Sequence, residues 1–354
     1  MPTRIVGIGS AVPPLAFTQE EVLSLLDIRD ARLRGVFLNG GISRRNLALP
    51  EGAATNAYPV ESNGQLIARH RRRALALAEE ALSTACAHAG VTMADVDFVC
   101  CVTSTGFLVP SLSTRLVAES EVPNNAARAD IVGMGCNAGL NGMQTAVNWS
   151  RSNPGLLAAL ICVEVCSAAY FDDGSMGSAV VNSLFGDGAA AALLRADDHT
   201  DGNDASAASP LVTDFANTIV PDSLSAMSFE WDDGAHKNGF QLSPDIPRTI
   251  GAAVPGLVLE LLEDADLGVH EVDHWILHAG GKKVVDSVRV NLGLSLYDVR
   301  HTLSVLNDHG NLSSASFLFS LQRLNQDPTV QPGDNGVMIT MGPGASIESA
   351  VVRW

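Results

Sequence analysis

The sequence predicts an α/β fold of five alternating layers (αβαβα) built from two duplicated halves. Two observations predict it. Apolar runs bounded by glycine alternate with helical patterns, and one helix–strand plan occurs twice along the chain. Continuous apolar runs are typical of strands that helices cover on both faces. The chain of 354 residues, 46% hydrophobic and 17% charged, suits two well-packed halves rather than a disordered protein.

The duplicated plan is a helix, a short link containing Val-Asp, an apolar strand and a turn of small residues. It occupies residues 74–106 and again residues 256–281. A second pair of segments, residues 185–195 and 342–353, repeats a glycine turn that leads into a buried strand. The repetition indicates two related layered units.

The boundary between the units is expected at residues 196–210. This stretch is polar, rich in small residues and ends at a proline, which is typical of a surface linker. We therefore expect one half over residues 1–200 and the other over residues 210–354.

Charge and cysteine spacing exclude several classes of function. The formal net charge of −17 argues against nucleic acid, whose phosphates need a basic surface, and against an anionic membrane face. No apolar run approaches the roughly 20 residues of a membrane span, and glycines and prolines interrupt the apolar N-terminal stretch. The six cysteines have neither the spacing of a disulfide framework nor that of a zinc site. We expect a cytoplasmic protein with reduced cysteines and with no metal, nucleic-acid or membrane partner.

The segment DIVGMGCNAGLNGMQTAV, residues 130–147, predicts a strand, a tight glycine turn and a helix. Cys136 stands in the turn, so its sulfur is expected near the start of the helix, where free N–H groups and the helix dipole favour a thiolate. A thiolate is the nucleophile that attacks a thioester carbonyl. The alternative is a small buried cysteine between glycines, which is what free cysteines usually are.

Two polar residues farther along the chain stand at the ends of predicted elements. His278 ends the apolar strand of WILHAGGKKVVDSV, where an imidazole can accept a proton or donate to a developing oxyanion. Asn311, in NDHGNLSSASFLFSL, precedes a helix and presents its amide there. A core histidine bonded to backbone and an ordinary turn asparagine remain the alternatives.

Together the three residues make the Cys-His-Asn set of decarboxylating condensing enzymes. The strings GMGCNAG, HAGG, GNLSSAS and MGPG resemble the type III polyketide synthases, the chalcone synthase-like family, from about residue 3 to Trp354. The resemblance implies a thiolase-like fold and a homodimeric acyltransferase that uses coenzyme A thioesters and no further cofactor. It implies that Cys136 holds the growing chain, and that His278 keeps it ionised as an ion pair. His278 and Asn311 would hydrogen-bond the thioester carbonyl during decarboxylation and condensation.

The longer strings VFLNGGISRR, CCVTSTGFLVP, NSLFGDG and GGKKVVDSVRVNLGLS resemble the bacterial members that make 3,5-dihydroxyphenylacetyl-CoA for glycopeptide antibiotics. The plant motifs Pro-Gly-Gly and GFGPG are replaced by Ala-Gly-Gly-Lys-Lys and MGPGAS, so a cinnamoyl-type starter is not expected. The resemblance implies four malonyl-CoA units as starter and extenders, an aldol ring closure, and accessory pathway enzymes as candidate partners for dehydration or release. The alternatives are another type III product (resorcinol, phloroglucinol or pyrone type), a ketoacyl synthase III-like enzyme, or a catalytically silent scaffold subunit.

Two phenylalanines are expected at the entrance of the pocket. By the same resemblance, Phe185 and Phe240 align with the pair that gates the passage between the CoA tunnel and the cyclisation cavity. Ordinary core packing is the alternative for Phe185. Glu164 and Asp187 are expected to brace loops and the floor of the site rather than to perform chemistry.

The phosphates of CoA need local positive charge in this acidic chain. We expect Arg44 and Arg45 to supply it, with Gly281 of the Gly-Gly turn also in the substrate site. Other basic positions compete for the phosphates, with solvated helix faces as the alternative reading: Lys282, Lys283, Arg69, Arg71, Arg72 and Arg73.

Overall fold

The computed structural model describes residues 1–53, 58–169, 173–196, 209–234 and 237–354. Its strands are β1 (Thr3–Ala11), β2 (Ala16–Thr18), β3 (Arg44–Asn46), β4 (Val96–Thr103), β5 (Ala127–Val132), β6 (Leu157–Val165), β7 (Asp187–Ala196), β8 (Leu211–Ile219), β9 (Met227–Asp232), β10 (Lys237–Leu242), β11 (His274–Leu277), β12 (Asn335–Gly342) and β13 (Ser346–Arg353). Its α-helices are α1 (Gln19–Leu25), α2 (Ala31–Leu38), α3 (Asn63–Ala89), α4 (Leu112–Glu119), α5 (Ala138–Ser152), α6 (Met176–Leu184), α7 (Ile246–Asp264), α8 (Lys282–Asn291), α9 (Arg300–His309) and α10 (Ser316–Asn325).

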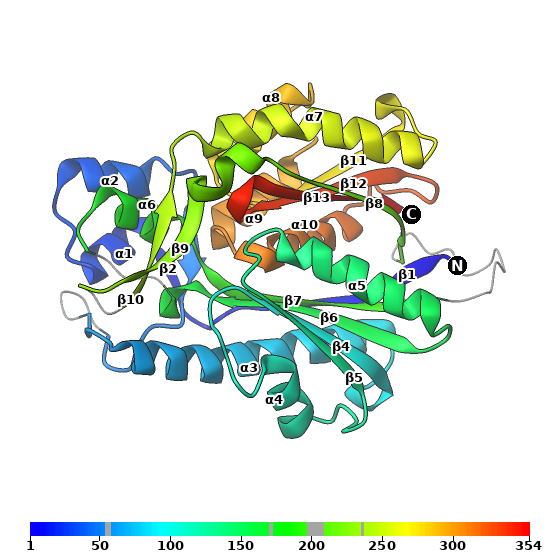
Figure 1. Ribbon diagram of the computed structural model, residues 1–354, viewed down its shortest axis with the longest axis horizontal. Coiled ribbons are helices and arrows are strands. Elements are labelled where there is room, and N and C mark those ends of the chain that lie inside the picture. The colour runs from blue at the N-terminus through cyan, green and yellow to red at the C-terminus, as the bar shows by residue number, and fades with distance from the viewer. Residues whose placement is uncertain (54–57, 170–172, 197–208, 235–236) are drawn as a thin grey trace.

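The elements stack in five layers (Figure 1). Helix α3 covers the outer face of β1, β6 and β7, and α7 packs with α8 over β8 and β13. Helices α5 and α10 lie between the two sets of strands and contact both. The predicted αβαβα arrangement is therefore confirmed.

Nine of the strands are joined by hydrogen bonds into one continuous sheet, in the order β11-β12-β13-β8-β1-β7-β6-β4-β5. Two sheets were expected, and their link is narrow: β1 pairs with β8 only at Thr3–Val212 and Arg4–Leu211. In contrast, β1 pairs with β7 along its whole length. The two sheets thus share one corner, from which they diverge to enclose the central helices.

The helix–strand plan that recurs in the sequence also recurs in space. Helix α3 leads through a 3₁₀ turn at Met93–Asp95 into β4, and α7 leads through a 3₁₀ turn at Val269–Glu271 into β11. The expected linker lies largely outside the described residues, between the end of β7 and the start of β8. The proposed boundaries of the two halves stay a prediction.

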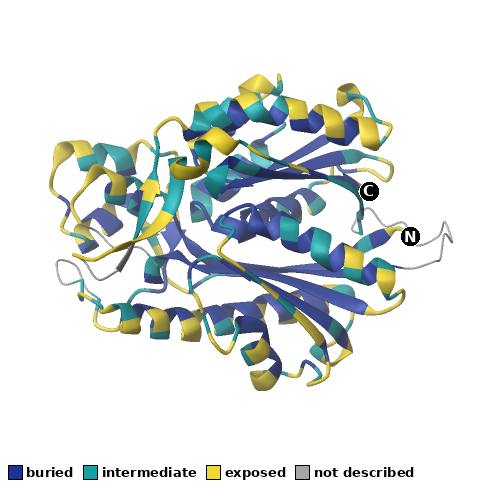
Figure 2. Cartoon of the chain, viewed as in Figure 1, coloured by how far each residue is buried: buried dark blue, intermediate teal, exposed yellow. Residues whose placement is uncertain are grey.

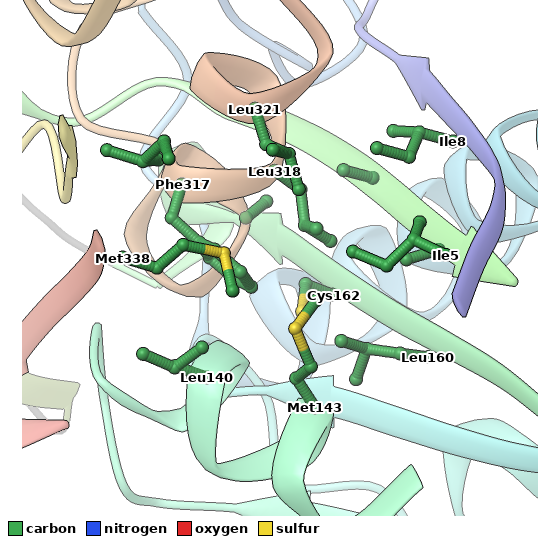
Figure 3. Close-up of a cluster of buried hydrophobic side chains, with 14 of the residues drawn as sticks. Ile5, Ile8, Leu140, Met143, Leu160, Cys162, Phe317, Leu318, Leu321 and Met338 are labelled. Carbon is green, nitrogen blue, oxygen red and sulfur yellow. The ribbon is translucent and has the colours of Figure 1, made fainter. Parts of the chain in front are cut away.

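The central layer is the most completely buried part of the molecule (Figure 2). Apolar side chains from both sheets meet those of α5 and α10 there (Figure 3). They include Ile5, Leu140, Met143, Leu160, Phe317 and Met338. Burying each such side chain contributes roughly 1.5–3 kcal/mol, so this layer rigidly positions the loops at its end. Within the described residues, each helix is either too short or too polar to cross a bilayer.

Candidate active site

Cys136 lies in the turn between β5 and α5, as the sequence predicts. Gly133 and Gly135 both have φ of +83°, a conformation that favours glycine. A Cβ built on Gly135 would lie 2.2 Å from Cδ of Pro343, so only glycine fits this close approach. The Gly135 N–H donates to the Ser104 hydroxyl at 2.9 Å, which holds the turn. Cys136 is 7% exposed.

Asn311 and Ser313, from the segment before α10, contact the sulfur of Cys136. The Cys136 thiol donates to the Ser313 hydroxyl at 3.5 Å, and the Asn311 side chain also hydrogen-bonds the sulfur. The Asn311 Oδ1 accepts the Ser313 N–H at 2.7 Å, so its NH₂ group is the end left to face the sulfur. Helix α5 lies directly against this segment, because a Cβ on Gly139 would come within 2.2 Å of the Ser314 carbonyl oxygen.

Ser313 was not predicted to contact the nucleophile. Its φ of +49° lies in the left-handed region, which costs a serine on the order of 1 kcal/mol and clusters at functional sites. In the sequence it resembles an ordinary capping serine, so no local signal distinguishes it.

His278 follows β11 directly and is 2% exposed. Its N–H donates to the Ile339 carbonyl at 2.8 Å, which fixes it beside β12. The end of β12 packs against the cysteine turn, since a Cβ on Gly342 would lie 2.1 Å from Oδ1 of Asn137. The histidine therefore lies at the same end of the sheet as the cysteine turn. Among the described residues, its Nδ1 has no hydrogen-bond partner.

Burial works against charge on both groups. It raises the pKa of Cys136 to about 12, and the hydrogen bonds from Ser313 and Asn311 only partly oppose this effect. Burial lowers the pKa of His278 to about 3. Desolvation thus outweighs the expected effect of the helix start, which would favour a thiolate. A thiolate–imidazolium pair can form only if both groups ionise together.

Glu164 is a fully buried carboxyl group, and its charge also raises the pKa of Cys136. It accepts the Ser104 N–H at 3.0 Å and the Ser314 hydroxyl at 2.5 Å, and burial raises its pKa. Asp187 is braced similarly by Ala48 and Ser167. Among the residues described, no group of three or more His, Cys, Asp or Glu side chains could hold a metal ion.

Phe185 and Phe240 meet at the cysteine. Their ring centroids are 5.7 Å apart with the planes at 77°, an edge-to-face contact. Both belong to an apolar cluster with Cys136, Cys166 and Val181. Cys166 and Val181 were not expected here, because in the sequence they resemble ordinary core residues.

Of the basic residues expected to bind the CoA phosphates, some are exposed and others are buried. Arg44 is exposed on β3, whereas Arg45 is 1% exposed and donates to the Phe185 carbonyl at 2.6 Å. The structure therefore gives no support to a contact between Arg45 and a CoA phosphate. Lys282 is exposed and its stem lies against the backbone of Gly41, close to the strand that carries Arg44.

Arg69 and Gly281, two other positions considered for the substrate site, are both buried. Arg69 is buried and donates to Glu61, Ala48 and Ser167, so it too has no donor at the surface. Gly281 is buried beside Leu184 with φ of +122°.

Comparison with known proteins identifies the family of the chain. The description "Chalcone and stilbene synthases, C-terminal domain" matches residues 213–354, and "FAE1/Type III polyketide synthase-like protein" matches residues 39–271. The chain is 46% identical to the 3,5-dihydroxyphenylacetyl-CoA synthases of Streptomyces toyocaensis and Amycolatopsis balhimycina, covering 99% of this chain and 90% and 93% of those proteins. The crystal structure of 1,3,6,8-tetrahydroxynaphthalene synthase from Streptomyces coelicolor A3(2) superposes with a TM-score of 0.85 at 25% identity, covering 98% of each chain. The thiolase-like fold, the arrangement around Cys136 and these matches establish that the chain belongs to the type III polyketide synthase family.

Proposed function

We propose that this type III polyketide synthase condenses malonyl-CoA units into 3,5-dihydroxyphenylacetyl-CoA, with Cys136, His278 and Asn311 as its catalytic residues. One observation carries the proposal. A buried cysteine contacted by the Asn311 amide stands in a chain 46% identical to proteins named for that product. Cys136 would hold the acyl chain as a thioester.

The orientation of Asn311 supports its role in decarboxylation. Loss of CO₂ from a malonyl thioester leaves an enolate, whose oxygen needs hydrogen-bond donors. Because Oδ1 of Asn311 is occupied by the Ser313 N–H, the amide NH₂ is directed toward the cysteine. With His278 as a second donor, each such contact would supply roughly 3 kcal/mol to the charged state.

The proposed product follows from the stoichiometry. Four malonyl-CoA molecules lose four CO₂ and three CoA to give an eight-carbon tetraketide thioester. Its methyl carbon attacks the third carbonyl counted from the methyl end, and loss of one water and enolisation complete the ring. Only this closure leaves the CH₂–CO–thioester arm outside the ring.

The substrate path is proposed along exposed basic residues and the phenylalanine pair. Arg44, Lys282 and Lys283 are exposed, and Lys282 packs against Gly41, three residues before Arg44; together they could bind the phosphates of CoA. Phe185 and Phe240 would close the passage to Cys136, with Gly281 forming part of its wall.

We also propose a homodimer, formed along β5. This strand ends the strand order, and most of its side chains are exposed. Val132 on the strand, and Phe107 and Val109 after the neighbouring strand β4, are large exposed apolar residues. Sedimentation should give the dimer mass, and Val132→Glu should shift it toward the monomer; an unchanged monomer mass in the wild type would contradict this.

Two further features of the proposal concern cellular context. All six cysteines are buried and unpaired, which agrees with a reducing cytoplasm. Accessory pathway enzymes could assist dehydration or release of the product.

The test of the catalytic assignment is the intact mass of the protein after incubation with malonyl-CoA. An acyl adduct that peptide mapping places on Cys136, and that Cys136→Ala lacks, is the expected result. An adduct on another residue would overturn the assignment.

A further inference from the structure

Arg45 is a charged side chain enclosed in the protein interior, although the sequence placed it beside Arg44 as a surface cation. Its guanidinium donates to two acceptors, the Phe185 carbonyl at 2.6 Å and the Gln19 side chain at 2.9 Å. Burial lowers its pKa to about 10, so the group stays charged near neutral pH. Burying a charge is costly unless its geometry is well satisfied, so this position calls for a physical explanation.

The bonds of Arg45 converge on one short segment. Gln19, which accepts from Arg45, donates its own amide to the Ser183 carbonyl at 2.8 Å. The carbonyls of residues 183 and 185 are therefore held by the same pair of side chains. Ser183 lies in the last turn of α6 and Phe185 is the residue that ends the helix, so these two bonds hold the chain where it leaves α6.

The same stretch of chain, where it leaves α6, pairs with Asn311. The Asn311 N–H donates to the Leu184 carbonyl at 2.9 Å, and the Asn311 carbonyl accepts the Gly186 N–H at 2.9 Å. Phe185 and Asn311 thus form a β-bridge, and Arg45 donates to the carbonyl of its first member.

Arg45 also contacts the residue before Asn311. A Cβ on Gly310 would lie 2.8 Å from Cδ and 3.0 Å from Cγ of Arg45, so the arginine stem packs directly against the glycine backbone. One side chain therefore touches Phe185 of the bridge and Gly310, the residue that precedes Asn311.

From these contacts we infer that Arg45 is a positioning residue: it holds Phe185 and Asn311 in register, so that the Asn311 amide meets the Cys136 thiol. The inference rests on the proposed role of Asn311 in decarboxylation. Arg45 itself touches neither substrate nor sulfur. Its loss should slow the step that needs Asn311 and leave substrate affinity nearly unchanged.

The experiment compares Arg45→Met, Arg45→Lys and the matched neighbour Arg44→Met in malonyl-CoA decarboxylation and in acyl transfer to Cys136. Arg45→Met should lower kcat for decarboxylation about tenfold to a hundredfold, the scale of a misplaced catalytic group, with KM within about threefold. Acyl transfer, followed by intact mass, should persist. Arg45→Lys keeps one donor and the charge, so its kcat should lie between those of Arg45→Met and wild type. Arg44→Met should instead raise KM.

A rise in KM at unchanged kcat in Arg45→Met would make Arg45 a substrate ligand and overturn the inference. Equal losses in acyl transfer and decarboxylation, or wild-type kinetics, would also overturn it. If Arg45→Met does not fold, Arg45→Lys decides by the same split between kcat and KM.

A second comparison separates this inference from the proposed function. If Arg45 acts through Asn311, adding Arg45→Met to Asn311→Ala should slow decarboxylation no further. An Asn311→Ala enzyme that decarboxylates normally would refute the role of Asn311 itself. An inactive Asn311→Ala beside a normal Arg45→Met would refute only the inference about Arg45.

Discussion

The Cys136 thiol donates a hydrogen bond to the Ser313 hydroxyl at 3.5 Å, although the two residues are 177 positions apart in the chain. The contact joins the turn before α5 to the turn before α10, the two helices of the central layer. Buried apolar side chains fill that layer (Figure 3). The close packing holds the nucleophile and the Asn311 segment in a fixed relation. The predictions below concern what this relation does.

Replacing Cys136 by alanine should abolish condensation and leave the fold intact. The new side chain is close in size to the old one, so the buried site should tolerate it. Product formation from malonyl-CoA and the thermal unfolding midpoint measure the two effects separately. Polyketide formation near the wild-type rate would show that the nucleophile lies elsewhere.

Replacing Asn311 by aspartate should impair decarboxylation more than acyl transfer. The amide donates to the enolate oxygen, whereas a carboxylate would repel the same developing charge. Loss of such a donor commonly costs about 10²–10³ in rate. CO₂ release and the intact mass of the acyl-enzyme report the two steps; equal losses in both would indicate a structural role for Asn311.

Replacing His278 by alanine should suppress alkylation of Cys136 by iodoacetamide at neutral pH. Burial raises the pKa of Cys136 to about 12, so any thiolate near pH 7 must be stabilised by a protonated His278. The pH profile of alkylation in His278→Ala should therefore lie at higher pH than in the wild type. Superimposable profiles would mean that the two residues do not form an ion pair.

His70 should make the protein less stable as the pH falls below neutrality. Burial lowers the pKa of this histidine to about 4, from an unfolded value of 6.5, so the unfolded chain binds a proton first. Its contribution is fully present above pH 6.5 and is lost between pH 6.5 and about 4, on the order of 3 kcal/mol. The fall in unfolding midpoint from pH 7 to pH 4.5 should be smaller in His70→Leu; an identical fall in both proteins would contradict the assignment.

The sequence singles out Cys136, His278 and Asn311 as candidates because each stands near glycines at the end of an element, which is a local signal. The layered fold was also predictable from apolar runs and the repeated helix–strand plan. The narrow junction of the two sheets, at Thr3–Val212 and Arg4–Leu211, was not, since it depends on how distant strands meet.

Arg45 and Ser313 show where the local signal fails. Adjacent residues of a strand point to opposite faces, so on β3 Arg44 is exposed while Arg45 is buried. A strand of three residues is too short to reveal that alternation in the sequence. The contact of Ser313 with Cys136 arises only when α5 packs against the segment before α10, a tertiary relation with no trace in either segment alone.

The central claim is that malonyl-CoA alone supplies both starter and extender units for 3,5-dihydroxyphenylacetyl-CoA. The most direct measurement gives the purified protein labelled malonyl-CoA as its sole substrate, with and without unlabelled acetyl-CoA, and identifies the product by mass spectrometry. The same donors, His278 and Asn311, can decarboxylate the first malonyl unit, so a separate acetyl-loading step is unnecessary. We therefore predict 3,5-dihydroxyphenylacetyl-CoA with label at every acyl carbon, undiluted by acetyl-CoA. Inactivity with malonyl-CoA alone, together with efficient priming by acetyl-CoA or an aromatic acyl-CoA, would contradict the account.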